Sequence, residues 1–268
     1  MLKPALTHQY PIAMAHRGST VLWPENTMQA FQGAVDLGYM YLETDVHATA
    51  DGVLVCFHDP VLDRTTDGTG PVLKRTLTEL SNVDAGHRFN PVHHFPARGQ
   101  GVSIPTLEEL ALTFPDVVIT VDLKASGIEQ LMADTISRLH LEDRIIVGSF
   151  VEKRVRKFRK IAGSRVATSA GPRETARIVF GAKLGRMPRV SADVLQVPEF
   201  HGRIHVVNER VIDIVQSQGK QVHVWTVNDP DEMARFLDLG VDGIVTDRPD
   251  LLKELVVERT GTWSAANG

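Results

Sequence analysis

The chain has 268 residues, 43% apolar and 23% charged, a composition typical of a globular protein with a substantial core. Its formal net charge of −4 argues against a general nucleic-acid binder, since such proteins carry a broad basic surface. The single cysteine, Cys56, excludes an intrachain disulfide and favours a reducing compartment. The N-terminus has no signal-like apolar stretch, and no run approaches the ~20 residues that span a bilayer. We therefore expect a cytoplasmic protein without integral membrane association.

Short runs rich in Val and Ile alternate along the chain with amphipathic stretches. Their continuous apolar character is typical of strands that are buried on both faces of a parallel sheet. The expected barrel strands are residues 12–15, 41–46, 117–123, 144–150, 165–170, 194–197, 221–227 and 243–246. Strands separated by helices in this number predict a (β/α)8 TIM barrel, formed as a single domain over residues 1–268.

Helix signals fill the intervals between these strands. Asn26 is expected to cap the first helix, and Thr106 with Glu109 makes a capping-box pattern further along. Apolar residues recur at helical spacing over residues 151–163. Asp229 precedes a helix with proline at its first position, and Pro249 opens the last helix.

Two segments break the alternation of strands and helices. Asp51-Gly52 is a hairpin signal, so residues 53–57 are predicted to fold back on the second strand and return His58 to the barrel mouth. Residues 59–116 are far longer than a usual βα loop and include a polar, glycine-rich stretch. We interpret this interval as a small cap over the barrel mouth, inserted after the second strand.

Carboxylates gather near the predicted carboxyl ends of two strands, where barrels of this kind place their sites. Glu43 and Asp45 are two residues apart and so point to one side of a strand. Their mutual repulsion raises the pKa of at least one carboxyl unless a cation lies between them. A divalent cation with Asp122 as third ligand is one solution, and carboxylates favour Mg²⁺, Ca²⁺ or Mn²⁺ over zinc. Ion pairing with Arg17 and Lys124 is the alternative.

Cations and histidines stand at the same strand ends. Arg17 offers a planar fork and Lys124 a point charge, and both suit a phosphate group. His16 and His58 are candidates for general acid and base because imidazole titrates near neutral pH. Trp225 ends the seventh strand and is either a core residue or an apolar wall of the site.

Other features are less specific. Three histidines of the insertion, His87, His93 and His94, are expected to be solvated or to make local contacts, and Cys56 to be a buried small hydrophobe. The helix over residues 151–163 is strongly basic; we interpret this as a solvated outer face, with docking to anionic lipid as the alternative. Its basic residues are Lys153, Arg154, Arg156, Lys157, Arg159 and Lys160.

Taken in order, the motifs resemble the glycerophosphodiester phosphodiesterase family in its cytosolic bacterial form. The resemblance runs from His16 to Pro249, and its specificity comes from the order and spacing of short pieces that are weak one by one. The matching pieces are His16-Arg17-Gly18, Pro24-Glu25-Asn26-Thr27, Glu43-Thr44-Asp45-Val46, Asp51-Gly52, His58-Asp59, Leu62-Asp63-Arg64-Thr65-Thr66, Pro105-Thr106-Leu107-Glu108-Glu109, Asp122-Leu123-Lys124, Ser149-Phe150, Trp225-Thr226-Val227-Asn228 and Gly243-Ile244-Val245-Thr246-Asp247-Arg248-Pro249.

The resemblance implies a TIM barrel with a small insertion after the second strand, and one bound divalent cation, Mg²⁺ or Ca²⁺, with Mn²⁺ as the alternative. The family usually has glutamate where this chain has Asp122, and the shorter side chain bears on metal choice and affinity. The implied roles are acid/base catalysis for His16 and His58, metal binding for Glu43, Asp45 and Asp122, phosphate binding for Arg17 and Lys124, and a substrate wall for Trp225.

The expected activity is metal-dependent hydrolysis of glycerophosphodiesters, such as glycerophosphocholine and glycerophosphoethanolamine, to glycerol 3-phosphate and an alcohol. The expected partner is therefore a small-molecule substrate. Two alternatives stay open: lysophospholipase D-type activity on lipid phosphodiesters, and a catalytically silent barrel that only binds glycerophosphate-type ligands. The motifs fix neither the attacking group, a glycerol hydroxyl or water, nor the oligomeric state.

Overall fold

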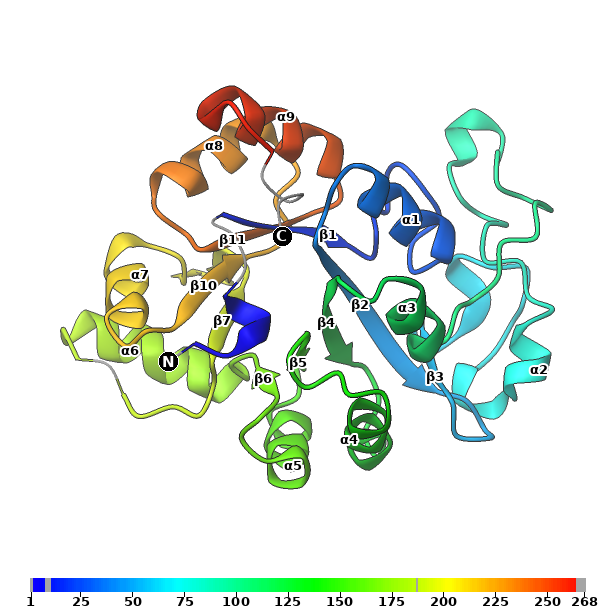
Figure 1. Cartoon of the computed structure of the whole chain (residues 1–268), viewed down its shortest axis with the longest axis horizontal. Helices are drawn as coiled ribbons and strands as arrows, with labels where there is room; N and C mark the ends of the chain where they lie inside the picture. The colour runs from blue at the N-terminus through cyan, green and yellow to red at the C-terminus, as the bar shows by residue number, and fades with distance from the viewer. Residues whose placement is uncertain (1, 8–10, 187, 264–268) are drawn as a thin grey trace.

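Parallel strands form a barrel in the part of the chain that the computed structural model describes, residues 2–7, 11–186 and 188–263 (Figure 1). Their order around the barrel is β6-β5-β4-β2-β1-β11-β10-β7. The bounds are β1 (Ile12–His16), β2 (Tyr41–Ala48), β4 (Val118–Leu123), β5 (Ile145–Gly148), β6 (Ala167–Thr168), β7 (Val194–Val197), β10 (Gln221–Val224) and β11 (Gly243–Thr246). All eight predicted strands are confirmed, although β5, β6 and β10 are shorter than expected.

The barrel is closed by a few contacts between β6 and β7, the two strands at the ends of this order. Ser169 forms a parallel bridge with Val194, and the Ala170 amide donates to the Val194 carbonyl at 2.9 Å. The Asp193 amide donates to the Thr168 carbonyl, also at 2.9 Å. The remaining neighbours pair in parallel register along their lengths. The TIM-barrel prediction is thus confirmed, with the weakest strand pairing between β6 and β7.

Helices cover the outside of the barrel, except for one short helix that lies in the insertion (Figure 1). Their bounds are α1 (Met28–Asp36), α2 (Leu77–Leu80), α3 (Leu107–Thr113), α4 (Glu129–Arg138), α5 (Glu152–Ala162), α6 (Pro172–Lys183), α7 (Glu209–Gln216), α8 (Pro230–Asp238) and α9 (Pro249–Thr260), with 3-10 turns η1 (Pro4–Leu6), η2 (Leu62–Arg64), η3 (Val72–Lys74) and η4 (Pro91–His93). Within the described ranges, every helix is too short or too polar to cross a bilayer.

Of the three residues expected to cap a helix, two do so in the structure. Asp229 and Thr106 accept hydrogen bonds from backbone amides of α8 and α3. The prediction for α1 is wrong by one residue, because Thr27 caps it by accepting from the Ala30 amide. Asn26 instead has a left-handed φ of 56° and donates from Nδ2 to Asp45. Its amide is committed to the site and is therefore not available to the helix.

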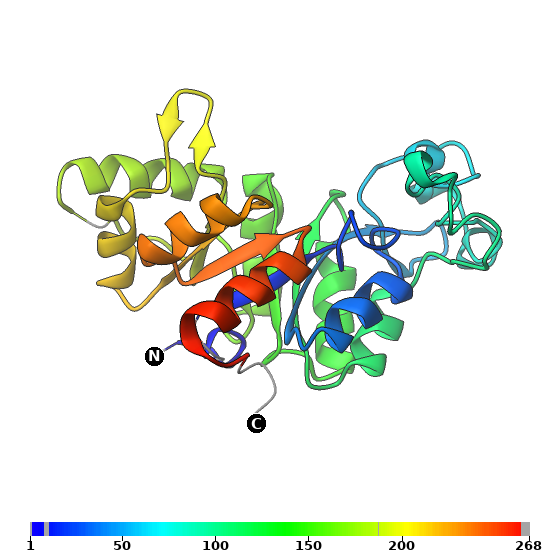
Figure 2. The same ribbon diagram turned by 90° about the horizontal axis from the view of Figure 1, so that it is seen from above.

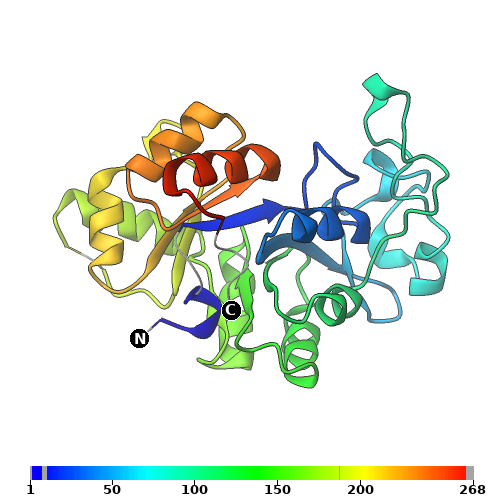
Figure 3. The same cartoon turned by 45° about the horizontal axis from the view of Figure 1, so that its top comes forward.

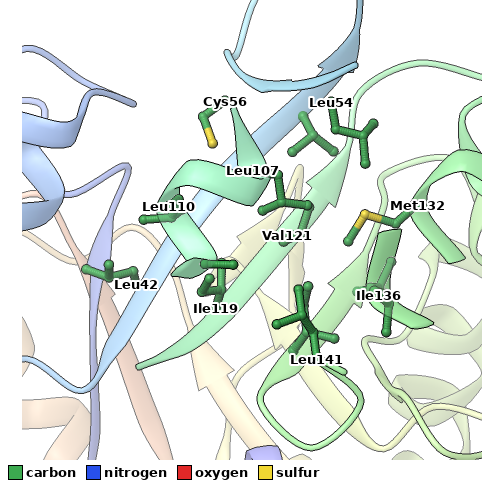
Figure 4. Packing of buried hydrophobic residues seen from close by; sticks show 14 of the residues in the cluster. Leu42, Leu54, Cys56, Leu107, Leu110, Ile119, Val121, Met132, Ile136 and Leu141 are labelled. Atoms are coloured by element: carbon green, nitrogen blue, oxygen red, sulfur yellow. The ribbon is translucent and has the colours of Figure 1, made fainter. Parts of the chain in front are cut away.

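The core lies mainly between the barrel and its helices. On one side, Leu42 and Val121 of the sheet pack against Leu107 of α3 and Met132 of α4 (Figure 4). Cys56 belongs to this cluster and is fully buried, as predicted. Burying such side chains is the main stabilising contribution to a fold of this kind. The second large cluster lies between the other strands and α6 to α9.

The returning strand and the insertion extend the barrel at one edge. β3 (Leu54–Cys56) pairs antiparallel with β2, as the Asp51-Gly52 signal predicts, and Gly52 has a left-handed φ of 79°. The insertion that follows has a small cluster of its own, which includes Leu62 and Leu80. It flanks the barrel at the side of β2 and β3 (Figure 3). The assignment of residues 59–116 as a cap insertion in a single domain stays a prediction.

Candidate active site

A cavity of ≈ 660 Å³ opens at the carboxyl ends of the barrel strands. None of the described residues of the insertion lines it. The structure brings all the candidate site residues to its wall: His16, Arg17, Glu43, Asp45, His58, Asp122, Lys124 and Trp225. This follows from the topology, because the carboxyl ends of parallel strands meet at one rim.

His16 is oriented by a carboxylate from the neighbouring strand end. Its Nδ1 lies 2.8 Å from Asp247 Oδ1, and its Nε2 lies 3.9 Å from Glu43 Oε2. Burial acts against protonation, but the hydrogen bond to Asp247 and the charge of Glu43 outweigh it, so the pKa of His16 is raised. Asn228 holds Asp247 in turn, donating from Nδ2 to Oδ2 at 3.0 Å. The ring is thus fixed with Nε2 directed at the carboxylate end of the cavity.

His58, also on the cavity wall, has a matching arrangement. Its Nδ1 lies 2.5 Å from Asp59 Oδ1. Arg64 donates from Nε to the other Asp59 oxygen and from its two Nη atoms to Glu25. Burial raises the pKa of Asp59, but Arg64 and His58 lower it below its usual value overall. Both histidines are therefore anchored through Nδ1 by an ionised carboxylate, which leaves Nε2 for proton transfer.

Arg17 and Lys124 lie among the carboxylates. Arg17 Nε is 3.0 Å from Asp45 Oδ2, and its Nη1 donates to Glu25 at 2.9 Å. Lys124 Nζ is 2.9 Å from Asp45 Oδ1 and 2.7 Å from Asp122 Oδ2. Burial raises the pKa of Asp45, yet Lys124 and Arg17 bring it below its usual value. Ion pairing, the alternative that the sequence left open, is therefore present in the structure.

The two cations do not neutralise all of the carboxylates. Burial, reinforced by the charge of Asp45, raises the pKa of Glu43 to about 7. Burial also raises the pKa of Asp122, against the opposing charge of Lys124. Asp122 Oδ1 is buried without a hydrogen-bond donor. Because Asp45 and Asp122 are cross-strand partners, these carboxylates share one side of the barrel rim.

This donor set fits a hard divalent cation in its chemistry, since it consists of carboxylate oxygens with unsatisfied negative charge. The side chains do not form a ready cage: no group of three or more His, Cys, Asp or Glu in the described ranges converges as metal ligands. Lys124 bridges Asp45 and Asp122 in their present arrangement.

Aromatic side chains form the next part of the wall. The Trp225 ring meets Phe150 edge-on, with centroids 5.3 Å apart, and Lys124 Nζ lies 5.1 Å from the centre of the Phe150 ring. Both rings line the cavity. Trp225 is thus a half-buried wall residue rather than a member of the closed core.

Beyond these rings the cavity continues as an apolar groove along α6. One helical face lines it over the whole helix, which at 12 residues and ~1.5 Å per residue is ~18 Å long. The opposite wall includes Ile204 and His201 of the two-stranded sheet of β8 (Phe200–His201) and β9 (Ile204–His205). The residues of α6 that line the groove are Pro172, Thr175, Ala176, Val179, Phe180 and Lys183.

A family model described as "Glycerophosphoryl diester phosphodiesterase family" matches residues 16–251. The chain belongs to this family. It is 37% identical to "Probable glycerophosphodiester phosphodiesterase 2" of Mycobacterium tuberculosis, over 97% of this chain and 96% of that protein. It is 31% identical to a glycerophosphodiester phosphodiesterase of Caldanaerobacter subterraneus subsp. tengcongensis, over 91% and 97% of the two chains. The family and the enzyme class predicted from the motifs are thereby confirmed.

Solved glycerophosphodiester phosphodiesterase structures share the fold. The crystal structure of the enzyme from Agrobacterium tumefaciens superimposes with a TM-score of 0.74 at 26% identity, over 94% of this chain and 99% of that one. A phosphodiesterase domain from Mycobacterium tuberculosis gives a TM-score of 0.81 at 24% identity, over 93% and 100%. Members of the family generally depend on a divalent cation, which agrees with the unsatisfied carboxylates of this site.

Several residues around the cavity escaped the sequence-based reasoning. Asp247 and Asp59 stand within the matching motifs, and their position beside strand-end histidines is the signal that could have identified them. Nothing in the sequence marks α6 as a groove wall. The histidines of the insertion do not line the cavity, and His87 Nδ1 lies 3.6 Å from a local acid, Asp84.

Proposed function

We propose that the chain hydrolyses glycerophosphodiesters such as glycerophosphocholine and glycerophosphoethanolamine to glycerol 3-phosphate and the free alcohol. The observation that carries this proposal is the pair of histidines on the cavity wall, each held at Nδ1 by an aspartate. A phosphodiester displacement needs one group to accept a proton and another to donate one, and a pair of oriented imidazoles supplies both.

In the proposed reaction, one histidine takes through Nε2 the proton of the attacking water or glycerol 2-hydroxyl, and the attacking oxygen bonds to phosphorus. The bond between phosphorus and the alcohol oxygen breaks, and the second histidine protonates the departing alkoxide. Where the 2-hydroxyl attacks, water then opens the cyclic phosphate to glycerol 3-phosphate. Arg17 and Lys124 stabilise charge on the nonbridging oxygens. A divalent cation held by Glu43, Asp45 and Asp122 would polarise the phosphoryl group when bound. The raised pKa of His16 suits this residue to donate a proton at neutral pH.

The test is release of glycerol 3-phosphate from glycerophosphocholine after EDTA treatment, with Mg²⁺, Ca²⁺ or Mn²⁺ added back. Release that a metal restores supports the proposal and ranks the ions. A folded protein that releases none with any ion contradicts it and favours the silent barrel. Phosphorus NMR under single-turnover conditions distinguishes the attacking group, because attack by the glycerol 2-hydroxyl produces a cyclic phosphate and attack by water does not.

The groove along α6 favours a second candidate substrate, a glycerophospholipid with a single acyl chain. Its apolar lining of Ala176, Val179 and Phe180 continues from the polar end of the same cavity. An extended chain of about the length of α6 would lie in it with the phosphodiester at the histidines. Choline release from lysophosphatidylcholine tests this candidate; turnover limited to soluble glycerophosphodiesters would dismiss it.

A further inference from the structure

Large apolar side chains are exposed on both sides of the groove. On α6, Phe180 is 65% exposed, and Leu184, just after the helix, is 67% exposed. Across the groove, Phe200 and Ile204 are 53% and 50% exposed. Single exposed apolar residues are common, but a group of large ones around one opening marks an interaction surface.

The β8–β9 hairpin stands away from the barrel sheet (Figure 2). Its register pairs Phe200 with His205 and His201 with Ile204, so one large apolar side chain lies on each of its faces. Ile204 faces the cavity, and Phe200 stacks on His205 on the other face with ring centroids 4.7 Å apart. A projecting hairpin with apolar residues on both faces buries little of that apolar surface in the protein core. It is therefore suited to inserting into another apolar environment.

Unpaired cations surround these apolar residues. Within the described residues, the six exposed cations named at the end of this paragraph form no ion pair with Asp or Glu. Of the nearby acids, Glu174 and Glu199 are already paired with Arg159 and Arg235, and Glu152 accepts from the Arg173 backbone amide. Positive charge is thus concentrated at this rim of a chain whose net charge is −4. The exposed cations of the rim are Arg173, Arg177, Lys183, Arg186, Arg189 and Arg203.

We propose that the groove rim docks on a membrane that contains anionic phospholipid; the rim consists of α6, residues 184–186 and 188–189, and the β8–β9 hairpin. Apolar side chains among unpaired cations match the boundary between acyl chains and anionic headgroups. The rim has a helix face and a projecting hairpin with the groove between them, and a fluid lipid surface accommodates this uneven shape without itself having a complementary shape. Docking brings the cavity mouth against the lipid. The inference goes beyond the proposed hydrolysis and does not require it.

The test is sedimentation of the full chain with vesicles of phosphatidylcholine and phosphatidylglycerol in equal parts, and with vesicles of phosphatidylcholine alone. We expect binding to the anionic vesicles that weakens as salt is added, because exposed charges are screened. The double variant Arg186→Glu with Arg203→Glu should weaken vesicle affinity by on the order of tenfold or more. Leu184→Ser with Phe200→Ser should weaken it by a similar factor.

Matched controls lie on other surfaces. Val92→Ser with Leu112→Ser removes apolar residues that are 82% and 60% exposed. Lys153→Glu with Lys160→Glu reverses two charges of α5, the helix that the sequence offered as a lipid-docking alternative. Both control proteins should bind like the unchanged chain. Equal loss in the controls, or full binding by the rim variants, overturns the proposal.

Two further readouts distinguish membrane docking from self-association and from loss of folding. If the chain dimerises through the rim and does not bind vesicles, the rim is a self-association surface and the proposal fails. Hydrolysis of soluble glycerophosphocholine is measured for every variant, and rim variants that retain it are folded. Vesicle binding that depends on the rim, without hydrolysis in any protein, would support docking and contradict the proposed function instead.

Discussion

Acid should destabilise the fold through His223, a fully buried histidine in the barrel interior. Burial lowers its pKa to about 3. Its neighbours also favour the neutral ring: Gln196 Nε2 lies 3.3 Å from Nδ1, and Gln221 Oε1 lies 3.2 Å from Nε2. An amide nitrogen can only donate, so Nδ1 must accept, and a second proton there would meet another donor.

The direction of the effect follows from proton linkage. Between about pH 6.5 and the folded-state pKa of about 3, the unfolded chain binds a proton at His223 that the folded chain does not. Stability is therefore lost as the pH falls through this window. Relative to pH 7, the loss from this residue at pH 5 is about 2 kcal/mol, since one pKa unit corresponds to about 1.4 kcal/mol.

The assay is urea unfolding of the unchanged chain and of His223→Gln at pH 7 and pH 5. Other carboxyl and histidine groups titrate in both proteins, so comparing the two pH-dependent losses isolates His223. The variant should lose about 2 kcal/mol less stability than the unchanged chain on this change of pH. Equal losses in the two proteins would refute the reasoning, whatever the absolute stability of the variant.

Three further predictions concern the site. His16→Ala and His58→Ala should each lower kcat for glycerophosphocholine by about 10²–10⁴, and near-normal turnover would remove that residue from the acid/base pair. Asp247→Asn and Asp59→Asn should lower kcat on the order of 10² or more with little change in KM; a rise in KM alone would instead assign these residues to substrate binding. Ala176→Trp should lower the kcat/KM ratio of lysophosphatidylcholine to glycerophosphocholine about tenfold, whereas Ala176→Ser should preserve that ratio, and an unchanged ratio in the tryptophan variant would mean that the groove holds no acyl chain.

The barrel and the positions of the candidate residues were predictable because both depend on short-range signals. Strands buried on both faces are continuous apolar runs, and their carboxyl ends meet wherever the sheet is parallel. Once β2 and β4 were located, Asp45 and Asp122 had to lie on the same rim, and the structure places them opposite each other in register. The turn at Gly52 was equally local and returned His58 to the cavity.

Features that depend on contacts between residues far apart in the sequence were not predictable in the same way. Asn26 has the chemistry of a helix cap, but its side chain bonds Asp45 and Thr44, so Thr27 takes the cap. The groove depends on the orientation of α6 relative to β8–β9, which no periodicity encodes. Phe180 and Ile204 have ordinary sequence neighbours, and only the fold shows that they share an opening.

The part of the cavity that Arg17 and Lys124 line has more carboxylates than these two cations can neutralise. Arg17 and Lys124 are the permanent cations beside the three carboxylates Glu43, Asp45 and Asp122, and Arg17 also pairs with Glu25. A phosphodiester is itself an anion and would be repelled by this excess. Burial, with the charge of Asp45 as a second cause, raises the pKa of Glu43 to about 7 when only the protein's own charges are present.

Positive charge added at these carboxylates would remove that repulsion. It would also release Arg17 and Lys124 from their present partners, Asp45 and Asp122, for the nonbridging oxygens of the substrate. The ion pairs of the structure and the metal site implied by the motifs are therefore compatible with each other. The same carboxyl groups hold the basic side chains in this structure and, as the proposed metal ligands, would hold a divalent cation that supplies positive charge.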